Sequence, residues 1–170
     1  MTDTNQDFLT TKIYRPPLPA DYVRRSDLLH LLDAGRSRPL ILVSAPAGYG
    51  KSVLVSHWAD SVAYPVAWIS LDESDSDLPQ FLDYLAAAVD EALPGACPAL
   101  KDLAGAGHLP PIEHLAGRLI NDLDGLDRRL VLCLDDFHRI APTSTVHELL
   151  SLLLKHPPRL LHLILIGRRD

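Results

Sequence analysis

The amino-acid sequence predicts an α/β domain in which a parallel sheet is covered by helices on both faces. Segments with the pattern of strands alternate with segments with the pattern of helices, which is the order that a parallel sheet requires. At least three of the strand segments are apolar throughout, as expected of strands that are buried on both faces. With 170 residues, 47% of them hydrophobic, the chain has the length and composition of one globular domain.

Continuous apolar runs mark the predicted strands. The run from residue 66 to residue 71, Val-Ala-Trp-Ile-Ser-Leu, is an example, because it combines β-branched and aromatic side chains with one polar residue. Four strands are predicted in this way, at about 40–45, 66–71, 129–134 and 161–167.

Helical spacing and helix-end signals mark the predicted helices. Ser26 can cap the first helix, which stops near Gly35, and Tyr64-Pro65 breaks the second. Apolar residues recur along one face of the third and fourth helices, and the fifth lies between Pro142 and Pro157. The helices are expected at about 26–33, 51–62, 78–93, 111–124 and 144–155. The other segments are a loose tail at 1–8, extended chain at 9–20, an acidic turn at 72–77 and a loop at 94–110.

The segment between the first strand and the second helix has the form of a phosphate-binding loop. From Leu40 to Leu54 it reads as a buried strand, a glycine-bearing loop and Lys-Ser at the start of a helix. Backbone N–H groups at a helix N-terminus, together with the helix dipole, suit the phosphates of a nucleoside triphosphate. Ala45 stands where the motif usually has glycine, which is tolerable if its φ is negative. The expected nucleotide-binding residues of the loop are Ala47, Gly48, Tyr49, Gly50, Lys51, Ser52 and Val53.

Three side chains are predicted to act on the phosphates and on a magnesium ion. Lys51 can bring its charge to the β- and γ-phosphates, and the hydroxyl of Ser52 can bind Mg²⁺. Asp135 ends the buried third strand, where phosphoryl-transfer sites of this class need a carboxylate to hold the magnesium shell. Since the carboxyl ends of parallel strands lie at one edge of a sheet, Asp135 is expected beside the phosphate loop. The plainer interpretation of this strand end is an ordinary acidic turn.

Residues just beyond the strand ends are further candidates for the reaction. Asp136 is placed to orient or deprotonate an attacking water, and Arg168 to contact the γ-phosphate, with Arg169 as the competing residue. An ordinary charged strand end is the alternative for the arginines. His138 lies beside the acids, but a capping or core histidine is the more common role. The catalytic set is therefore Lys51, Asp136 and Arg168.

Composition excludes several other classes of protein. The formal net charge of −6 gives no general nucleic-acid footprint, so this chain is not expected to bind DNA directly. The two cysteines and the scattered histidines lack the pattern of a disulfide scaffold or a zinc site. The polar N-terminus is unlike a signal peptide, and the longest apolar runs are only strand-length, which predicts a cytoplasmic protein without membrane contact. Trp58, Trp68 and Cys133 are expected in the core.

Taken together, these segments resemble a known family. The chain is similar to the N-terminal part of the STAND-type P-loop ATPase module of maltose-regulon-activator-like and large ATP-binding LuxR-type transcriptional regulators. Members of that family commonly have alanine at the place of Ala45. The resemblance covers nearly the whole chain, through Thr11–Pro17, Val23–Arg25, Ser44–Ser52, Trp58, Ala67–Asp72, Leu119–Leu123, Leu132–His138 and Ile166–Arg168.

The resemblance implies a fold and a mechanism. The fold would be a P-loop NTPase of the additional-strand, AAA-like class, with strand four between strands one and three. ATP, with Mg²⁺, would switch the protein from an ADP-bound form to an assembly-competent one, and slow hydrolysis would reset it. Residues 1–38 would form a lead-in whose Val23 and Arg25 lie near the adenine, and residues 39–170 the NTPase core. Such regulators have a fifth strand beside strand one, so the core is expected to be truncated after the fourth strand.

Three functions from different classes fit these features. The favoured one is the ATP-binding switch module of a signal-responsive bacterial transcriptional regulator, here without its sensor and helix-turn-helix domains. Its partners would be ATP and either the rest of a larger regulator or further copies that associate on ATP binding. The second is a free-standing P-loop enzyme such as a small-molecule kinase, with residues 94–117 as a lid. The third is a non-hydrolysing interaction fragment.

Overall fold

The computed structural model describes residues 8–168 and contains one four-stranded parallel sheet. The predicted tail lies, except for Phe8, outside these residues, as does Arg169. The strand order is β1-β4-β3-β2, which confirms the fourth strand between the first and the third. The strands are β1 (Leu40–Ser44), β2 (Val66–Ser70), β3 (Leu130–Asp135) and β4 (Leu161–Gly167). The helices are α1 (Ser26–Gly35), α2 (Lys51–Ser61), α3 (Leu78–Ala92), α4 (Pro98–Ala104), α5 (Ile112–Asp124) and α6 (Thr145–Lys155).

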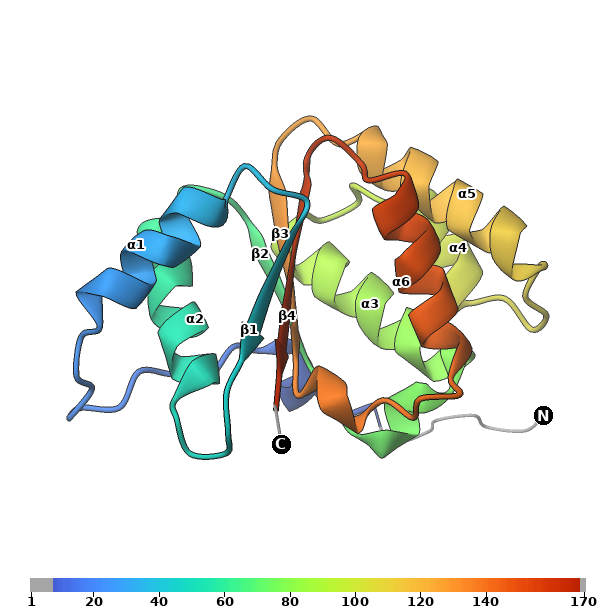
Figure 1. The fold of residues 1–170 in the computed structure, drawn as a ribbon. Helices are drawn as coiled ribbons and strands as arrows, with labels where there is room; N and C mark the ends of the chain where they lie inside the picture. The colour runs from blue at the N-terminus through green and yellow to red at the C-terminus, as the bar shows by residue number, and fades with distance from the viewer. Residues whose placement is uncertain (1–7, 169–170) are drawn as a thin grey trace.

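Helices cover both faces of the sheet, as the alternating pattern predicted. Figure 1 shows α1 and α2 on one face and α3, α4, α5 and α6 on the other. Successive residues of a strand point to opposite faces, so β3 contributes to two cores. Val131 and Cys133 pack with α2 through Trp58, whereas Leu132 and Leu134 pack in the larger core with α3, α5 and α6. The two tryptophans and Cys133 are buried, as predicted, and burial raises the pKa of the Cys133 thiol.

One segment predicted to be a loop contains a helix. Within residues 94–110, Pro98–Ala104 forms α4, whose Leu100 and Leu103 are each 1% exposed. The side chain of Asp122, on α5, accepts a hydrogen bond from the backbone N–H of Leu100 at 2.9 Å and satisfies a free donor at the start of α4. A single turn or two of helix is unstable alone. The prediction was wrong here because α4 depends on a cap and a core that lie elsewhere in the chain.

Smaller differences concern the N-terminal half. Ser26 is the first residue of α1 and its side chain makes no capping hydrogen bond, so the cap predicted for it is absent. Residues Thr10–Ile13 form a 3-10 turn within the segment predicted to be extended. The acidic turn is a short 3-10 helix, Glu73–Ser76, closed by a reciprocal capping box between Asp72 and Asp75. No helix in the described part of the chain is both long and apolar enough to cross a membrane.

The strand order decides which residues meet at the carboxyl edge of the sheet. β1 is an edge strand and its Leu42 is 65% exposed, so the first strand is less buried than its apolar sequence predicted. In the register of the sheet, Ser44 of β1 pairs with Gly167 of β4, and Ser70 of β2 pairs with Asp135 of β3. The segments that follow these strands therefore converge at one end of the molecule, which is the lower end in Figure 1.

Candidate nucleotide-binding site

The loop between β1 and α2 has the backbone conformation of an anion-binding turn. Gly48 has a φ of 79° and Gly50 a φ of 68°, both in the left-handed region that favours glycine. Gly50 directly precedes α2, so the turn leads into the free N–H groups of the helix N-terminus. Among residues 8–168 the one non-glycine residue with a positive φ is Asp136, so the φ of Ala45 is negative. The alanine in place of glycine is thus accommodated without strain.

The side chain of Lys51 is held by its own loop. Its Nζ donates hydrogen bonds to the backbone carbonyls of Ala45 at 2.8 Å and Pro46 at 2.9 Å. Carbonyl oxygens are neutral acceptors, whereas phosphate oxygens carry negative charge and attract an ammonium group more strongly. An anion in the loop would therefore compete well for this ammonium group.

Ser52 and Asp135 meet directly, although 83 residues separate them in sequence. The Ser52 hydroxyl donates a hydrogen bond of 2.8 Å to Oδ1 of Asp135, which also accepts a 2.9 Å bond from the backbone N–H of Asp136. Asp135 is 5% exposed, and burial raises the pKa of its carboxyl, an effect that the bond from Ser52 opposes.

This pair has the chemistry of a magnesium site. Hydroxyl and carboxylate oxygens are hard ligands, and Mg²⁺ commonly uses one or two protein oxygens together with substrate phosphates and waters. Among residues 8–168 no group of three or more His, Cys, Asp or Glu side chains is placed to hold a metal ion by itself. The buried charge of Asp135 also has no cation paired with it among the described salt bridges.

Asp136 has an unusual backbone conformation at this strand end. Its φ is 56°, in the left-handed region, which aspartate tolerates better than most residues. Such conformations cost free energy and concentrate at functional sites. The Asp136 carboxylate is about half exposed, and Nδ1 of His138 lies 3.9 Å from its Oδ1. The carboxylate is thus accessible to solvent beside the buried Asp135.

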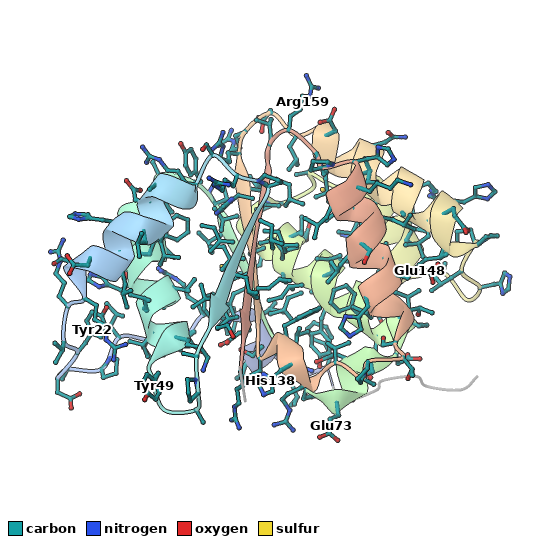
Figure 2. The ribbon with its side chains drawn as sticks, viewed as in Figure 1. Tyr22, Tyr49, Glu73, His138, Glu148 and Arg159 are labelled. Atoms are coloured by element: carbon teal, nitrogen blue, oxygen red, sulfur yellow. The ribbon has the colours of Figure 1, made fainter. Side chains whose placement is uncertain are left out.

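Arg168 emerges between the two motifs. It follows β4, which lies between the phosphate-loop strand β1 and the Asp135 strand β3. A Cβ built on the neighbouring Gly167 would lie 3.8 Å from the backbone nitrogen of His138, so the end of β4 is close to the Asp136 turn. Arg168 is exposed. Figure 2 shows Tyr49 of the phosphate loop and His138 at the same end of the molecule.

A largely apolar cavity of about 370 Å³ adjoins the phosphate loop. It lies between α1 and β1, and Arg25, Leu42, Tyr49 and Lys51 are among its lining residues. The Arg25 guanidinium donates a 2.7 Å hydrogen bond to the carbonyl of Tyr49 and so ties the lead-in to the loop. Val23 is 75% exposed and does not line this cavity. The structure therefore brings Arg25 to the site, whereas Val23 lies apart from it.

Two features of the site were missed by sequence reasoning. The first is the pair of loop carbonyls that hold Lys51, because a backbone acceptor leaves no pattern of side chains in the sequence. The second feature is a further cavity beside Ser52 and Asp135, which Tyr14 and Arg15 also line. The arginine-proline pair at 15–16 was predicted to be extended chain and was counted in the family resemblance, but nothing local to it indicates which part of the fold it contacts.

Residues 23–166 match the family described as "AAA ATPase domain". The chain belongs to that family. The phosphate loop, the Ser52–Asp135 pair and the strand order of this AAA ATPase domain all fall within the matched residues.

Curated relatives confirm the resemblance to MalT-type regulators. The domain is 33% identical over 160 residues to the HTH-type transcriptional regulator MalT of Cronobacter sakazakii, and 34% identical over 160 residues to MalT of Yersinia pestis. Each alignment covers 94% of this chain and 18% of the relative, so the chain spans about a fifth of the length of these regulators.

Solved structures with a similar fold include a Walker-type ATPase. The Walker-type ATPase of Pyrococcus abyssi aligns with a TM-score of 0.54 and 15% identity, over 91% of this chain and 47% of that one. Cdc6p from Pyrobaculum aerophilum aligns with a TM-score of 0.57 and 15% identity, over 94% of this chain and 43% of that one. At such low identity the likeness concerns the fold, and it confirms the predicted P-loop NTPase class.

Proposed function

We propose that this AAA ATPase domain is the ATP-binding switch module of a signal-responsive bacterial transcriptional regulator, with slow ATP hydrolysis that resets it. The observation that carries the proposal is the 2.8 Å bond between Ser52 and Asp135, next to a glycine-containing loop at a helix N-terminus. A loop of this kind could serve any phosphate, but the adjoining carboxylate and hydroxyl suit a magnesium–triphosphate. The name of the MalT relatives supports the regulatory role.

On this proposal each residue of the site has a separate role. Backbone N–H groups from Ala47 to Val53 bind the phosphates, and Lys51 leaves its loop carbonyls for the β- and γ-phosphate oxygens. Ser52 and Asp135 would hold Mg²⁺, which would neutralise charge that develops on the phosphates. Asp136 orients the attacking water and accepts its proton, because its carboxylate is accessible where that of Asp135 is buried. Arg168 contacts the γ-phosphate.

The lead-in would supply the adenine side of the site. The cavity lined by Arg25 and Tyr49 has a volume of about 370 Å³, within the range of ligand pockets, and its lining is mostly apolar as a purine ring requires. On this proposal residues 1–38 are the lead-in and residues 39–170 the NTPase core. The partners of the domain would be ATP and the rest of a larger regulator, or further copies on ATP binding, and DNA would be contacted elsewhere than on this chain.

The alternative of a small-molecule kinase finds no support in the described residues. Its lid was expected in 94–117, but that segment contains α4 and the start of α5. The first of these helices packs on α3 and the second on α4 and α6, on the face of the sheet away from α1 and α2.

Lys51→Ala is expected to weaken binding of a fluorescent ATP analogue with magnesium by about 100-fold. The variant removes the one loop cation that can form charge-assisted bonds with the phosphates, and truncation of such a partner typically costs a few kcal/mol. Equilibrium titration of the 170-residue chain by fluorescence anisotropy measures the effect.

Lys101→Ala is the matched control for that titration. Lys101 is an exposed lysine on α4, remote from the phosphate loop, and its loss should change the dissociation constant less than about twofold. Equal affinity of the Lys51→Ala variant and the unaltered chain, or no binding by the folded chain, contradicts the proposal.

Arg168→Ala is expected to slow ATP hydrolysis at least about tenfold while binding of ADP stays within about twofold. An arginine at the γ-phosphate stabilises charge that is absent from ADP. Phosphate release under single-turnover conditions, together with an ADP titration, separates the two effects. A parallel loss of ATP and ADP affinity would assign Arg168 a structural role instead.

A further inference from the structure

A segment before α1 crosses the carboxyl edge of the sheet beside the proposed magnesium residues. We call Thr10–Pro17 the N-terminal strap. It runs from the corner between β2 and α3 to the middle of α2, and one of its residues is bound at each of these two places. None of its residues belongs to the phosphate loop or to a strand.

The first anchor is Lys12, at the corner between β2 and α3. Lys12 is 7% exposed, and its Nζ donates hydrogen bonds to the carboxylates of Asp75 and, at 3.0 Å, Asp72. The ammonium group also lies 4.3 Å from the ring centroid of Tyr84. Burial alone would lower the pKa of Lys12, but the two carboxylates outweigh it and raise the pKa, so that the lysine stays charged.

The second anchor is Arg15, which binds two residues of α2. Its guanidinium donates a 2.8 Å hydrogen bond to the backbone carbonyl of Ser56 and forms an ion pair with Asp60. The Ser56 hydroxyl donates a 2.6 Å bond back to the carbonyl of Pro16. Ser56 lies one turn after Ser52 on the same face of α2. The strap is thus fixed to the helix that carries the proposed magnesium hydroxyl.

Between the two anchors the strap borders a cavity of about 490 Å³. The far wall of this cavity is formed by Ser52, Ser70 and Asp135, and the near wall by strap residues that include Thr11 and Tyr14. Tyr14 is 52% exposed, so its position at this wall is not a consequence of packing in the core. The Arg25 cavity, by contrast, lies on the other side of the phosphate loop, next to β1.

We propose that the strap forms the outer wall of the magnesium end of the nucleotide site, and that Arg15 is a positioning residue that sets α2, and with it Ser52, against Asp135 and this wall. This inference rests on the proposed nucleotide site. The strap would confine the hydrated Mg²⁺ and the terminal phosphate, whereas the sugar and base are bound on the opposite side of the loop. Arg15 itself acts through Ser56 and Asp60 and touches neither the metal nor the phosphates.

The test is a magnesium titration of nucleotide binding by the full 170-residue chain. Arg15→Ala is expected to raise the Mg²⁺ concentration at half-maximal effect by about tenfold, since changes behind a metal ligand typically have effects of that order. Affinity for the fluorescent ATP analogue in EDTA should change less than about twofold. Asp60→Asn, which removes the ion pair from the other side, should give a smaller shift in the same direction, and Arg15→Asp with Asp60→Arg should partly restore the midpoint.

Arg159→Ala is the matched control, because Arg159 pairs with Asp124 at the opposite end of the molecule, as Figure 2 shows for Arg159. An unchanged magnesium midpoint for Arg15→Ala overturns the inference. An equal loss of affinity with magnesium and in EDTA also overturns it, because a purely structural role would weaken both. Failure of the unaltered chain to bind at all, with Lys51→Ala indistinguishable from it, overturns the proposed function and this inference with it.

Discussion

Replacing Asp135 by asparagine is expected to abolish the magnesium dependence of nucleotide binding and at the same time to stabilise the empty domain. The carboxylate is 5% exposed with no cation paired to it in the described part of the chain, and burial disfavours its charged form. Asparagine keeps an oxygen that can accept the bonds from Ser52 and from the backbone of Asp136. The gain should be about 1 kcal/mol at pH 7, or roughly 2–4 °C in Tm.

The pH dependence of this effect has a definite sign. Because the folded protein raises the pKa of Asp135, it binds this proton more tightly than the unfolded chain does. Protonation therefore stabilises the fold as the pH falls through the raised pKa, and the stabilisation is lost as the pH rises. The advantage of Asp135→Asn should be largest at neutral pH and shrink on acidification towards the raised pKa. Thermal unfolding followed by circular dichroism between pH 4 and 7 measures it.

Asp136→Asn is the control for the Asp135 variant. Asparagine also tolerates the left-handed backbone at this position, and the side chain is about half exposed, so Tm should stay within about 1 °C. Magnesium-dependent binding should persist while hydrolysis is lost. A lower Tm for Asp135→Asn than for the unaltered domain would contradict this prediction. It would show that the buried carboxylate stabilises the fold.

The parts of the fold that were predicted correctly are those encoded by neighbouring residues. A buried strand such as β3 needs only a continuous apolar run, and the phosphate loop needs only its glycines and the Lys51-Ser52 pair in the right order. The side of the sheet on which these motifs meet follows from the direction of parallel strands. The Ser52–Asp135 bond was therefore within reach of sequence reasoning. The position of β4 between β1 and β3 was inferred from the family resemblance and not from the residues.

The missed features depend on partners that are distant in sequence. The α4 helix begins on a hydrogen bond to Asp122, and a cap supplied by another helix leaves no pattern in the segment that it caps. Lys12 lies in an unremarkable polar stretch, and its two carboxylate partners follow 60 and 63 residues later. Arg25 was placed near the adenine through the family resemblance, but its bond to the carbonyl of Tyr49 has a backbone acceptor, which every residue possesses.

Lys12→Met is expected to cause the largest loss of stability of any single change discussed, about 3 kcal/mol. The Asp75 carboxylate is fully buried, and without Lys12 it keeps only hydrogen bonds from the backbone N–H of Asp72 and from Gln80. Leaving a buried charge without its partner typically costs 3–5 kcal/mol, and those remaining donors place the effect near the lower end. Methionine retains the apolar stem, so the loss reports on the charge. Urea unfolding followed by tryptophan fluorescence, with Trp58 and Trp68 buried, measures it.

A double variant decides whether the loss comes from an unpaired charge or from a looser strap. Lys12→Met with Asp75→Asn has no buried charge left at this corner, and replacing both members of a buried ion pair is often close to neutral. The double variant should therefore recover at least half of the stability lost in the single one. If it is less stable than Lys12→Met alone, the Asp75 carboxylate is stabilised by its capping role at Glu73–Ser76 rather than by Lys12. Arg159→Met, which breaks an exposed pair, should change the urea midpoint little, because solvent screens that interaction.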